Sequence, residues 1–126
     1  MADWFTAEEK TCHCGCGSNL VDQNLDFLQA LNSAREIYGK PMDATSMTRC
    51  ARYNRTIGGA PKSGHLEGRA ADIACRDPRE RLPMVMALLA AGFRRIEISA
   101  VHVHADMKRS EPNPECLLLK TERGLV

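Results

Sequence analysis

Near the middle of the chain the sequence reads Ser63-Gly64-His65-Leu66-Glu67-Gly68-Arg69-Ala70-Ala71-Asp72. From Arg69 to Cys75 the residues are mostly small or apolar, which predicts a short buried strand. Asp72 lies inside that strand, and a buried carboxylate requires a charged partner or a metal ion. The glycines and alanines beside His65 and Asp72 let other backbone segments approach closely. The stretch therefore predicts a core strand that also carries part of a polar site.

Downstream, the sequence reads Val101-His102-Val103-His104-Ala105-Asp106. Side chains alternate between the two faces of a strand, so both histidines and the aspartate point to one side. The two valines and the alanine point to the other side, which is typical of a strand with one packed face and one chemical face. Imidazole and carboxylate are the usual ligands of a catalytic zinc ion, which keeps three protein ligands and one open position. The two stretches together predict a metal site.

Two helices are expected on either side of the middle stretch. The first covers Asp22 to Tyr38. The second begins near Arg79, because Pro83 must lie in its first turn, and it ends at Gly92. The expected apolar stripes consist of Val21, Leu25, Leu28, Leu31, Ala34 and Ile37 in the first helix and of Leu82, Val85, Met86 and Leu89 in the second.

Strands are expected at residues 43–50 and 69–75, with a loop at residues 54–64. Residues 93–99 and 101–107 are expected to form either two strands or one long bent strand. Residues 108–126 are expected to form an irregular tail, in which Cys116 to Leu119 make a short edge strand. This order of elements predicts one α+β domain over residues 1–126, with a small antiparallel sheet flanked by helices. Residues 1–19 form a Cys-rich N-terminal segment of that domain.

Composition excludes several classes of function. The chain has 126 residues and a net charge of +1, which favours one modest core and predicts neither a nucleic-acid partner nor an anionic membrane. No stretch approaches the roughly 18 apolar residues of a membrane span. The N-terminus lacks the basic and apolar regions of a signal peptide, so we expect synthesis in the cytoplasm, as a monomer.

The motif Ser63-x-His65-x-x-Gly68-x-Ala70-x-Asp72, followed by His102-x-His104, resembles the signature of the zinc D-alanyl-D-alanine carboxypeptidases. This family includes the VanY-type peptidases and small phage members, and it shares its fold with the Hedgehog signalling domain. The resemblance covers roughly residues 20–107. It implies a Hedgehog/DD-peptidase-like fold and a Zn²⁺ ion held by His65, Asp72 and His104.

The resemblance also implies residues that bind the substrate. The family carries an arginine before the first zinc ligand, and Ser46-Met47-Thr48-Arg49 stands at that place, although Met47 and Thr48 depart from the usual glycine and aromatic residue. Arg49 would act as a catalytic residue that binds the substrate carbonyl or carboxylate with its forked donors and polarises the peptide bond, and it would do little for the fold. Ser63 would hydrogen-bond the site or the substrate.

The sequence indicates the general base less clearly than it indicates the zinc ligands. Many members of the family carry a Glu or Asp three residues before the last zinc histidine, and Val101 stands at that position. His102 is the nearest substitute and ranks first as the catalytic acid–base group. Glu97 ranks second, because strict alternation puts it on the opposite face from His104 unless a bulge intervenes. Asp106 ranks third and would orient His102 or a ligand.

The function implied by the resemblance is that of a zinc metallopeptidase that cleaves peptidoglycan stem peptides as a D-Ala-D-Ala carboxypeptidase. A phage or prophage cell-wall hydrolase of this kind reaches the wall after release through a membrane lesion. One alternative is an L-Ala-D-Glu endopeptidase endolysin. Another is a catalytically inactive, zinc-bearing module that binds the cell wall on the same fold. Balanced charge and few aromatic residues argue against a nucleic-acid-binding or partner-binding module built on the cysteines.

A cysteine cluster, Cys12-His13-Cys14-Gly15-Cys16, stands apart from these motifs. Thiolates at such tight spacing bind metal ions, and Cys50 or Cys116 would then supply a fourth ligand. A disulfide to Cys50 is an equal alternative, and so are reduced thiols that only pack in the interior. The sequence leaves these three states open.

Overall fold

The computed structural model describes residues 2–110 and 117–120. Its helical elements are α1 (Ala7–Lys10), η1 (Val21–Gln23), α2 (Leu25–Tyr38), α3 (Ala51–Thr56), η2 (Gly64–Glu67), η3 (Pro78–Glu80) and α4 (Arg81–Ala90). Its strands are β1 (Ala44–Ser46), β2 (Ala70–Ala74), β3 (Arg95–Ile98), β4 (His102–Asp106) and β5 (Leu117–Lys120). Within the described residues, no helix combines the length and apolar character needed to cross a membrane.

The strands form one sheet in the order β1-β2-β4-β3-β5. The first four strands pair antiparallel, which confirms the predicted α+β class with a small antiparallel sheet. β5 lies at the edge, as expected for this part of the chain, but it runs parallel to β3. Cys116, which the predicted edge strand included, lies outside the described residues.

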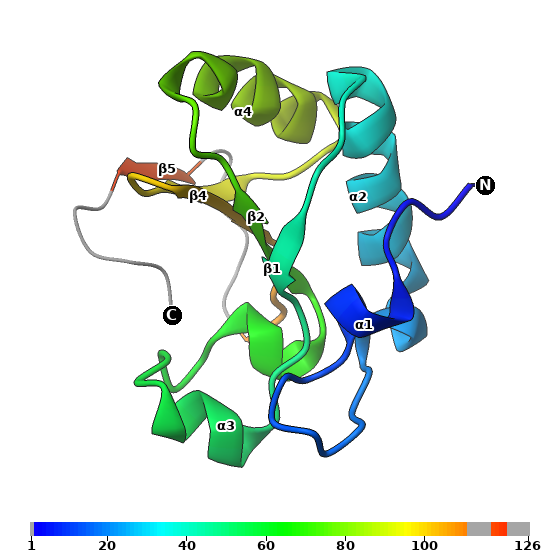
Figure 1. The fold of residues 1–126 in the computed structure, drawn as a ribbon, viewed down its shortest axis with the longest axis vertical. Coiled ribbons are helices and arrows are strands. Elements are labelled where there is room, and N and C mark those ends of the chain that lie inside the picture. Colours follow the sequence, from blue (N-terminus) through cyan, green and yellow to red (C-terminus); the bar gives the residue numbers. More distant parts are fainter. Residues whose placement is uncertain (1, 111–116, 121–126) are drawn as a thin grey trace.

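One face of the sheet carries the hydrophobic core. Val103 and Ala105 of β4 are fully buried among apolar residues, together with Ile96 of β3, which confirms the predicted packed face at these two positions. The prediction that Val101 also packs there is wrong, because it precedes β4 and is 42% exposed. The helices α2 and α4 pack against each other and supply the other side of this core, while α3 lies at the opposite end of the molecule from α4 (Figure 1). The rings of Phe27 and Phe93 meet edge to face at 6.0 Å within the core. The opposite face of the sheet is free for polar side chains.

The first long helix begins later than the sequence predicts. A turn of 3-10 helix, Val21–Gln23, comes first, and the non-helical Asn24 separates it from α2. The Asn24 side chain donates to the carbonyl oxygens of Glu67 and Gly68, so it ties this break to η2. Two positions of the predicted stripe are wrong, since Leu25 is 59% exposed and Ile37 is 56% exposed. The buried face consists of Phe27, Leu28, Leu31, Asn32 and Ala34.

The second helix also presents a different face from the predicted one. Asp77 caps η3, and α4 follows at Arg81, so Pro83 lies in the first turn as expected. Leu82 and Met86 belong to the predicted stripe but are 67% and 59% exposed. The buried residues are Met84, Val85, Ala87 and Leu88. Because almost every position of this helix is apolar, periodicity alone could not identify the buried face.

Two further elements differ from the predicted ones. The expected strand at residues 43–50 is reduced to Ala44–Ser46, with an irregular register against β2. The expected loop at residues 54–64 begins inside a short helix, Ala51–Thr56. The thiol of Cys50 accepts a hydrogen bond from the backbone N–H of Tyr53 and so caps this helix. A sulfur cap is not among the usual helix start signals, which explains why the sequence did not indicate the helix.

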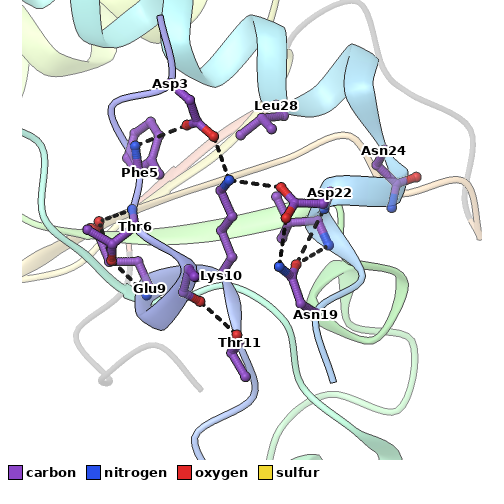
Figure 2. Close-up of polar contacts among 12 residues, drawn as sticks. Asp3, Phe5, Thr6, Glu9, Lys10, Thr11, Asn19, Asp22, Asn24 and Leu28 are labelled. Atoms are coloured by element: carbon purple, nitrogen blue, oxygen red, sulfur yellow. Dashed lines mark hydrogen bonds and ion pairs between the residues drawn. The ribbon is translucent and has the colours of Figure 1, made fainter. Parts of the chain in front are cut away.

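The N-terminal segment is held by a lysine that points inward (Figure 2). The Lys10 ammonium lies 2.5 Å from Asp3 Oδ2 and 2.8 Å from Asp22 Oδ1, and the side chain is buried. The carboxylate of Glu9, the residue before Lys10, accepts from the backbone N–H groups of Thr6 and Ala44, which joins α1 to the edge strand β1. The segment is therefore fastened to the sheet and to the start of α2 by ion pairs and hydrogen bonds.

Replacement of Lys10 by methionine is expected to lower the free energy of unfolding by about 1–3 kcal/mol, because Asp3 would lose a charged hydrogen-bond donor. Burial opposes ionisation of Asp3, but the hydrogen bonds from Lys10 and from the Phe5 N–H lower its pKa. This contribution is present above the ordinary carboxyl range and is lost as the pH falls through the lowered pKa. Urea unfolding at neutral and acidic pH measures both effects.

The matched control is Lys40→Met. Lys40 pairs with Glu80 at the surface and is largely exposed, so its replacement is expected to cost at most about 1 kcal/mol. Equal losses for the two variants at neutral pH would contradict the role assigned to Lys10.

Candidate metal centre

The polar face of the sheet carries a row of side chains in register. Asp72 of β2 pairs with His104 of β4, and His104 pairs with Glu97 of β3. Residues directly opposite each other on antiparallel strands share a face, so all three side chains emerge on the same side. The expectation that Glu97 lies on the opposite face from His104 is wrong. It treated residues 97 and 104 as one continuous strand, whereas a hairpin separates β3 from β4 and resets the alternation.

The two histidines of the predicted ligand set converge on one carboxylate oxygen. Asp72 Oδ1 lies 3.2 Å from His65 Nε2 and 2.7 Å from His104 Nδ1. The ring centroids of the two histidines are 5.2 Å apart. One potential ligand atom from each of the three residues lies within 4.8 Å of the others. The structure therefore brings together the three side chains that the sequence separates into two motifs.

The His65 ring is fixed in one orientation by the backbone. Its Nδ1 lies 2.6 Å from the carbonyl oxygen of Met47, so Nδ1 carries the proton and donates it. That leaves Nε2 unprotonated, and this buried nitrogen has no hydrogen-bond partner. Burial also lowers the pKa of His65, against the opposing influence of Asp72, which keeps the ring neutral. A neutral imidazole with a free, buried lone pair has the form required of a metal ligand.

The turn that carries His65 is held by its neighbours in the motif. The Ser63 hydroxyl accepts from the backbone N–H of His65 and caps η2. Gly68 ends this turn with φ +69°, and a Cβ there would come within 2.4 Å of the Leu20 Cβ. Both the left-handed backbone and the close approach require glycine. The predicted close packing around the motif is confirmed at this position.

Asp106 supports His104 from the other edge of the ring. Its Oδ2 lies 2.8 Å from His104 Nε2, and its Oδ1 lies 3.4 Å from Arg95 Nε. Burial opposes protonation of His104, but the hydrogen bonds with Asp106 and Asp72 raise its pKa to about 9. Of the two roles expected for Asp106, the contacts fit orientation of a ligand. A carboxylate behind a histidine is the usual support of a metal-bound imidazole.

The charge and chemistry of these three donors suit a metal ion. Despite burial, the hydrogen bond with His104 holds the pKa of Asp72 far below its usual range, so the carboxylate is ionised. One anionic oxygen and two imidazole nitrogens form the donor set of catalytic zinc sites. The unpartnered Nε2 of His65 faces this oxygen. The residues present therefore fit a divalent metal ion.

Arg49 is more deeply buried than the sequence suggests, with only 2% of its surface exposed. Its Nη2 lies 3.1 Å from Asp72 Oδ2, and its Nε donates to Ser46 Oγ at 3.1 Å. Its Nη1 lies 3.4 Å from Asn54 Oδ1. The expectation that Arg49 does little for the fold disagrees with this burial, because the guanidinium holds the oxygen of Asp72 that faces away from the histidines. Substrate binding by Arg49 stays a prediction.

Replacement of Arg49 by methionine is expected to lower the free energy of unfolding by about 2–4 kcal/mol, because it leaves a buried carboxylate without its arginine. The loss stays below the largest values for a broken buried ion pair, since His104 also offers a positive charge to Asp72. Thermal or urea unfolding of the metal-free protein provides the measurement. Arg52→Met, on the exposed side of α3, is the matched control and should be nearly neutral. An Arg49 variant as stable as the control would contradict the positioning role.

His102 lies on the same face of β4 as His104, as predicted, and its Nδ1 is buried without a hydrogen-bond partner. Two groups that contribute to the site were not predicted from the sequence. The Met47 carbonyl that orients His65 is a backbone group and carries no sequence signal. Asn54, which joins Arg49 to the Ala60 carbonyl, lies where a loop was expected, and a buried asparagine cannot be told from an exposed one by sequence alone.

Two histidines and an ionised aspartate, gathered beside one face of the sheet, form a group that could hold a divalent metal ion. The Peptidase M15 family matches residues 3–106, most of the chain, and the chain belongs to that family. It is therefore a peptidase of a metal-dependent class, and its candidate ligands are the residues that the geometry selects. None of the curated proteins matches the chain.

Proposed function

We propose that this protein is a zinc metallopeptidase that removes the terminal D-alanine from peptidoglycan stem peptides, as a monomeric cell-wall hydrolase of phage or prophage origin. The observation that carries the proposal is the convergence of His65 Nε2 and His104 Nδ1 on Asp72 Oδ1. Membership of the Peptidase M15 family supports the peptidase chemistry. The motif resemblance to zinc D-alanyl-D-alanine carboxypeptidases supports the choice of metal and substrate.

When bound, zinc would polarise the scissile carbonyl and make water a stronger acid. The protein's own residues prepare the site for this role. Met47 holds His65 in the tautomer that presents Nε2, and Asp106 fixes the ring of His104. Arg49 donates a hydrogen bond to Asp72 Oδ2 and so orients the carboxylate. Substrate contacts of Arg49 and Ser63, which the resemblance implies, are part of the proposal, although the burial of both residues favours positioning roles.

Proton transfer is assigned to Glu97 and His102. Glu97 lies directly opposite the ligand His104 in the β3–β4 pair, so its carboxylate can accept the proton of the attacking water. His102 lies two residues before His104 on the same face, where its imidazole can donate to the leaving amine or stabilise the tetrahedral intermediate. The corrected register moves Glu97 ahead of His102 as the general base.

The test is mass analysis of purified muropeptides after incubation with zinc-loaded protein. Loss of one terminal alanine from pentapeptide stems is the expected result. Cleavage between L-alanine and D-glutamate would overturn the carboxypeptidase assignment in favour of an endopeptidase. Retention of intact muropeptides on the protein, with no product after prolonged incubation, would instead identify a cell-wall-binding module.

A further inference from the structure

The cysteine cluster of the N-terminal segment lies outside the candidate metal centre. Cys12, Cys14 and Cys16 come from the N-terminal segment, and Cys50 comes from the start of α3. One sulfur from each of the four lies within 4.8 Å of the others. We propose that these four thiolates hold a second zinc ion with a structural role. It would join the N-terminal segment to α3, the helix that follows Arg49 in the chain.

The spacing of the sulfurs fits a shared ion better than a disulfide. Cys14 Sγ lies 3.5 Å from Cys12 Sγ and 3.6 Å from Cys50 Sγ. In a tetrahedron with zinc–sulfur bonds of about 2.3 Å, neighbouring sulfurs lie about 3.8 Å apart. A disulfide requires about 2.0 Å between sulfurs, and all four cysteines are free thiols. The Cys14 sulfur has two neighbouring sulfurs at similar distances. This arrangement is expected for several ligands around one ion and not for two sulfurs joined in a disulfide.

Backbone donors surround the four sulfurs. The N–H of Cys50 donates to Cys12 Sγ at 3.4 Å, and the N–H of Tyr53 donates to Cys50 Sγ at 3.4 Å. The sulfurs of Cys14 and Cys16 accept from the N–H groups two residues further on. Donors directed at sulfur stabilise thiolates and are the usual second shell of metal–thiolate centres.

The composition of the cluster indicates a structural site. Four sulfur ligands fill a tetrahedral zinc ion and leave no position for water or substrate, unlike the three-ligand set of His65, Asp72 and His104. Soft thiolates select zinc over the harder magnesium and calcium ions. Without an ion, ionisation of several thiols at this spacing would be opposed by their mutual repulsion.

Such an ion would affect the candidate metal centre through the chain. Cys50 follows Arg49 directly and caps α3, and Asn54 of that helix contacts the Arg49 guanidinium. Cys12 is near enough to Arg49 for its negative charge to act on that group. The N–H of Cys12 also donates to the Ser18 carbonyl and closes the cysteine loop on itself. The thiolate site would therefore fix the segment that positions Arg49.

The experiment is metal analysis and cobalt spectroscopy on the full chain, purified under reducing conditions. Wild-type protein is expected to hold two zinc ions, and cobalt-exchanged protein should show the intense near-ultraviolet band of sulfur-to-cobalt charge transfer. Cys50→Ser and Cys16→Ser should lose one zinc ion and this band. His65→Ala should also lose one zinc ion but keep the band, so the failure of either site is seen separately.

Two further variants serve as controls. Cys75 is buried but lies outside the cluster, so Cys75→Ser should keep both zinc ions and the band. Cys16 is exposed, and Cys16→His should retain zinc, because three thiolates and an imidazole also form a structural zinc site. Absence of the band in cobalt-exchanged wild-type protein, or an intact mass that shows a disulfide in protein purified without reductant, would overturn the proposal.

Discussion

Replacement of His65 by alanine is expected to remove the ion of the His65–Asp72–His104 centre and to reduce peptide cleavage by at least roughly 10³-fold, since Lewis-acid stabilisation contributes several kcal/mol. The ring is completely buried, and its Nε2 is one of three donors around the same point. Two remaining ligands cannot hold the ion at the site with comparable affinity. Zinc content and the rate of alanine release from muropeptides are measured on the same preparation.

His13→Ala provides the matched control, because His13 is exposed and belongs to neither group of candidate ligands. Its metal content and activity should equal those of the wild type. Circular dichroism of the His65 variant separates loss of the ion from loss of the fold. Unchanged zinc content in a folded His65→Ala protein would show that the ligand assignment is wrong.

Replacement of Glu97 by glutamine is expected to reduce turnover by roughly 10²–10⁴-fold while the metal content stays unchanged. The amide has the size of the carboxylate but cannot accept a proton at neutral pH. Glu97 pairs directly with His104 across two strands, so its side chain lies beside a metal ligand without belonging to the ligand set. Single-turnover cleavage of muropeptides by the zinc-loaded variant measures the chemical step.

His102→Ala is the comparison that decides the roles, and Glu8→Gln, on the exposed side of α1, is the neutral control. We expect a smaller loss for His102→Ala than for Glu97→Gln, because a stabilising group contributes less than the base. The reverse order, with zinc retained in both proteins, would make His102 the base and return Glu97 to a supporting role.

The sequence by itself determines which side chains of one strand share a face. Alternation along a strand depends only on the backbone of that strand, so the shared side of His102, His104 and Asp106 follows from their spacing. The same holds for the small residues of the motif before Asp72, whose size allows close packing. The order of the two motifs supports the family resemblance, which in turn implies His65, Asp72 and His104 as ligands. These features are local and require no knowledge of which segments meet.

Other features depend on contacts between segments that are distant in the chain. The position of Glu97 beside His104 depends on the hairpin between β3 and β4, because the turn decides which residues face each other. The faces of α2 and α4 depend on how the two helices pack, which an almost uniformly apolar sequence such as that of α4 does not encode.

The cysteine cluster and Arg49 show the same difference between features set by local sequence and features set by long-range contacts. The sequence places Cys12, Cys14 and Cys16 close together, since they are separated by single residues, but it leaves Cys50 and Cys116 as equal candidates for a fourth ligand. Only the fold brings Cys50 to the cluster. Likewise, the Arg49 guanidinium lies against Asp72 because β1 pairs with β2 at Ser46 and Asp72, and because the Arg49 N–H donates to the His65 carbonyl of η2. Long-range packing decides which polar groups lose water, and therefore which of them must find partners.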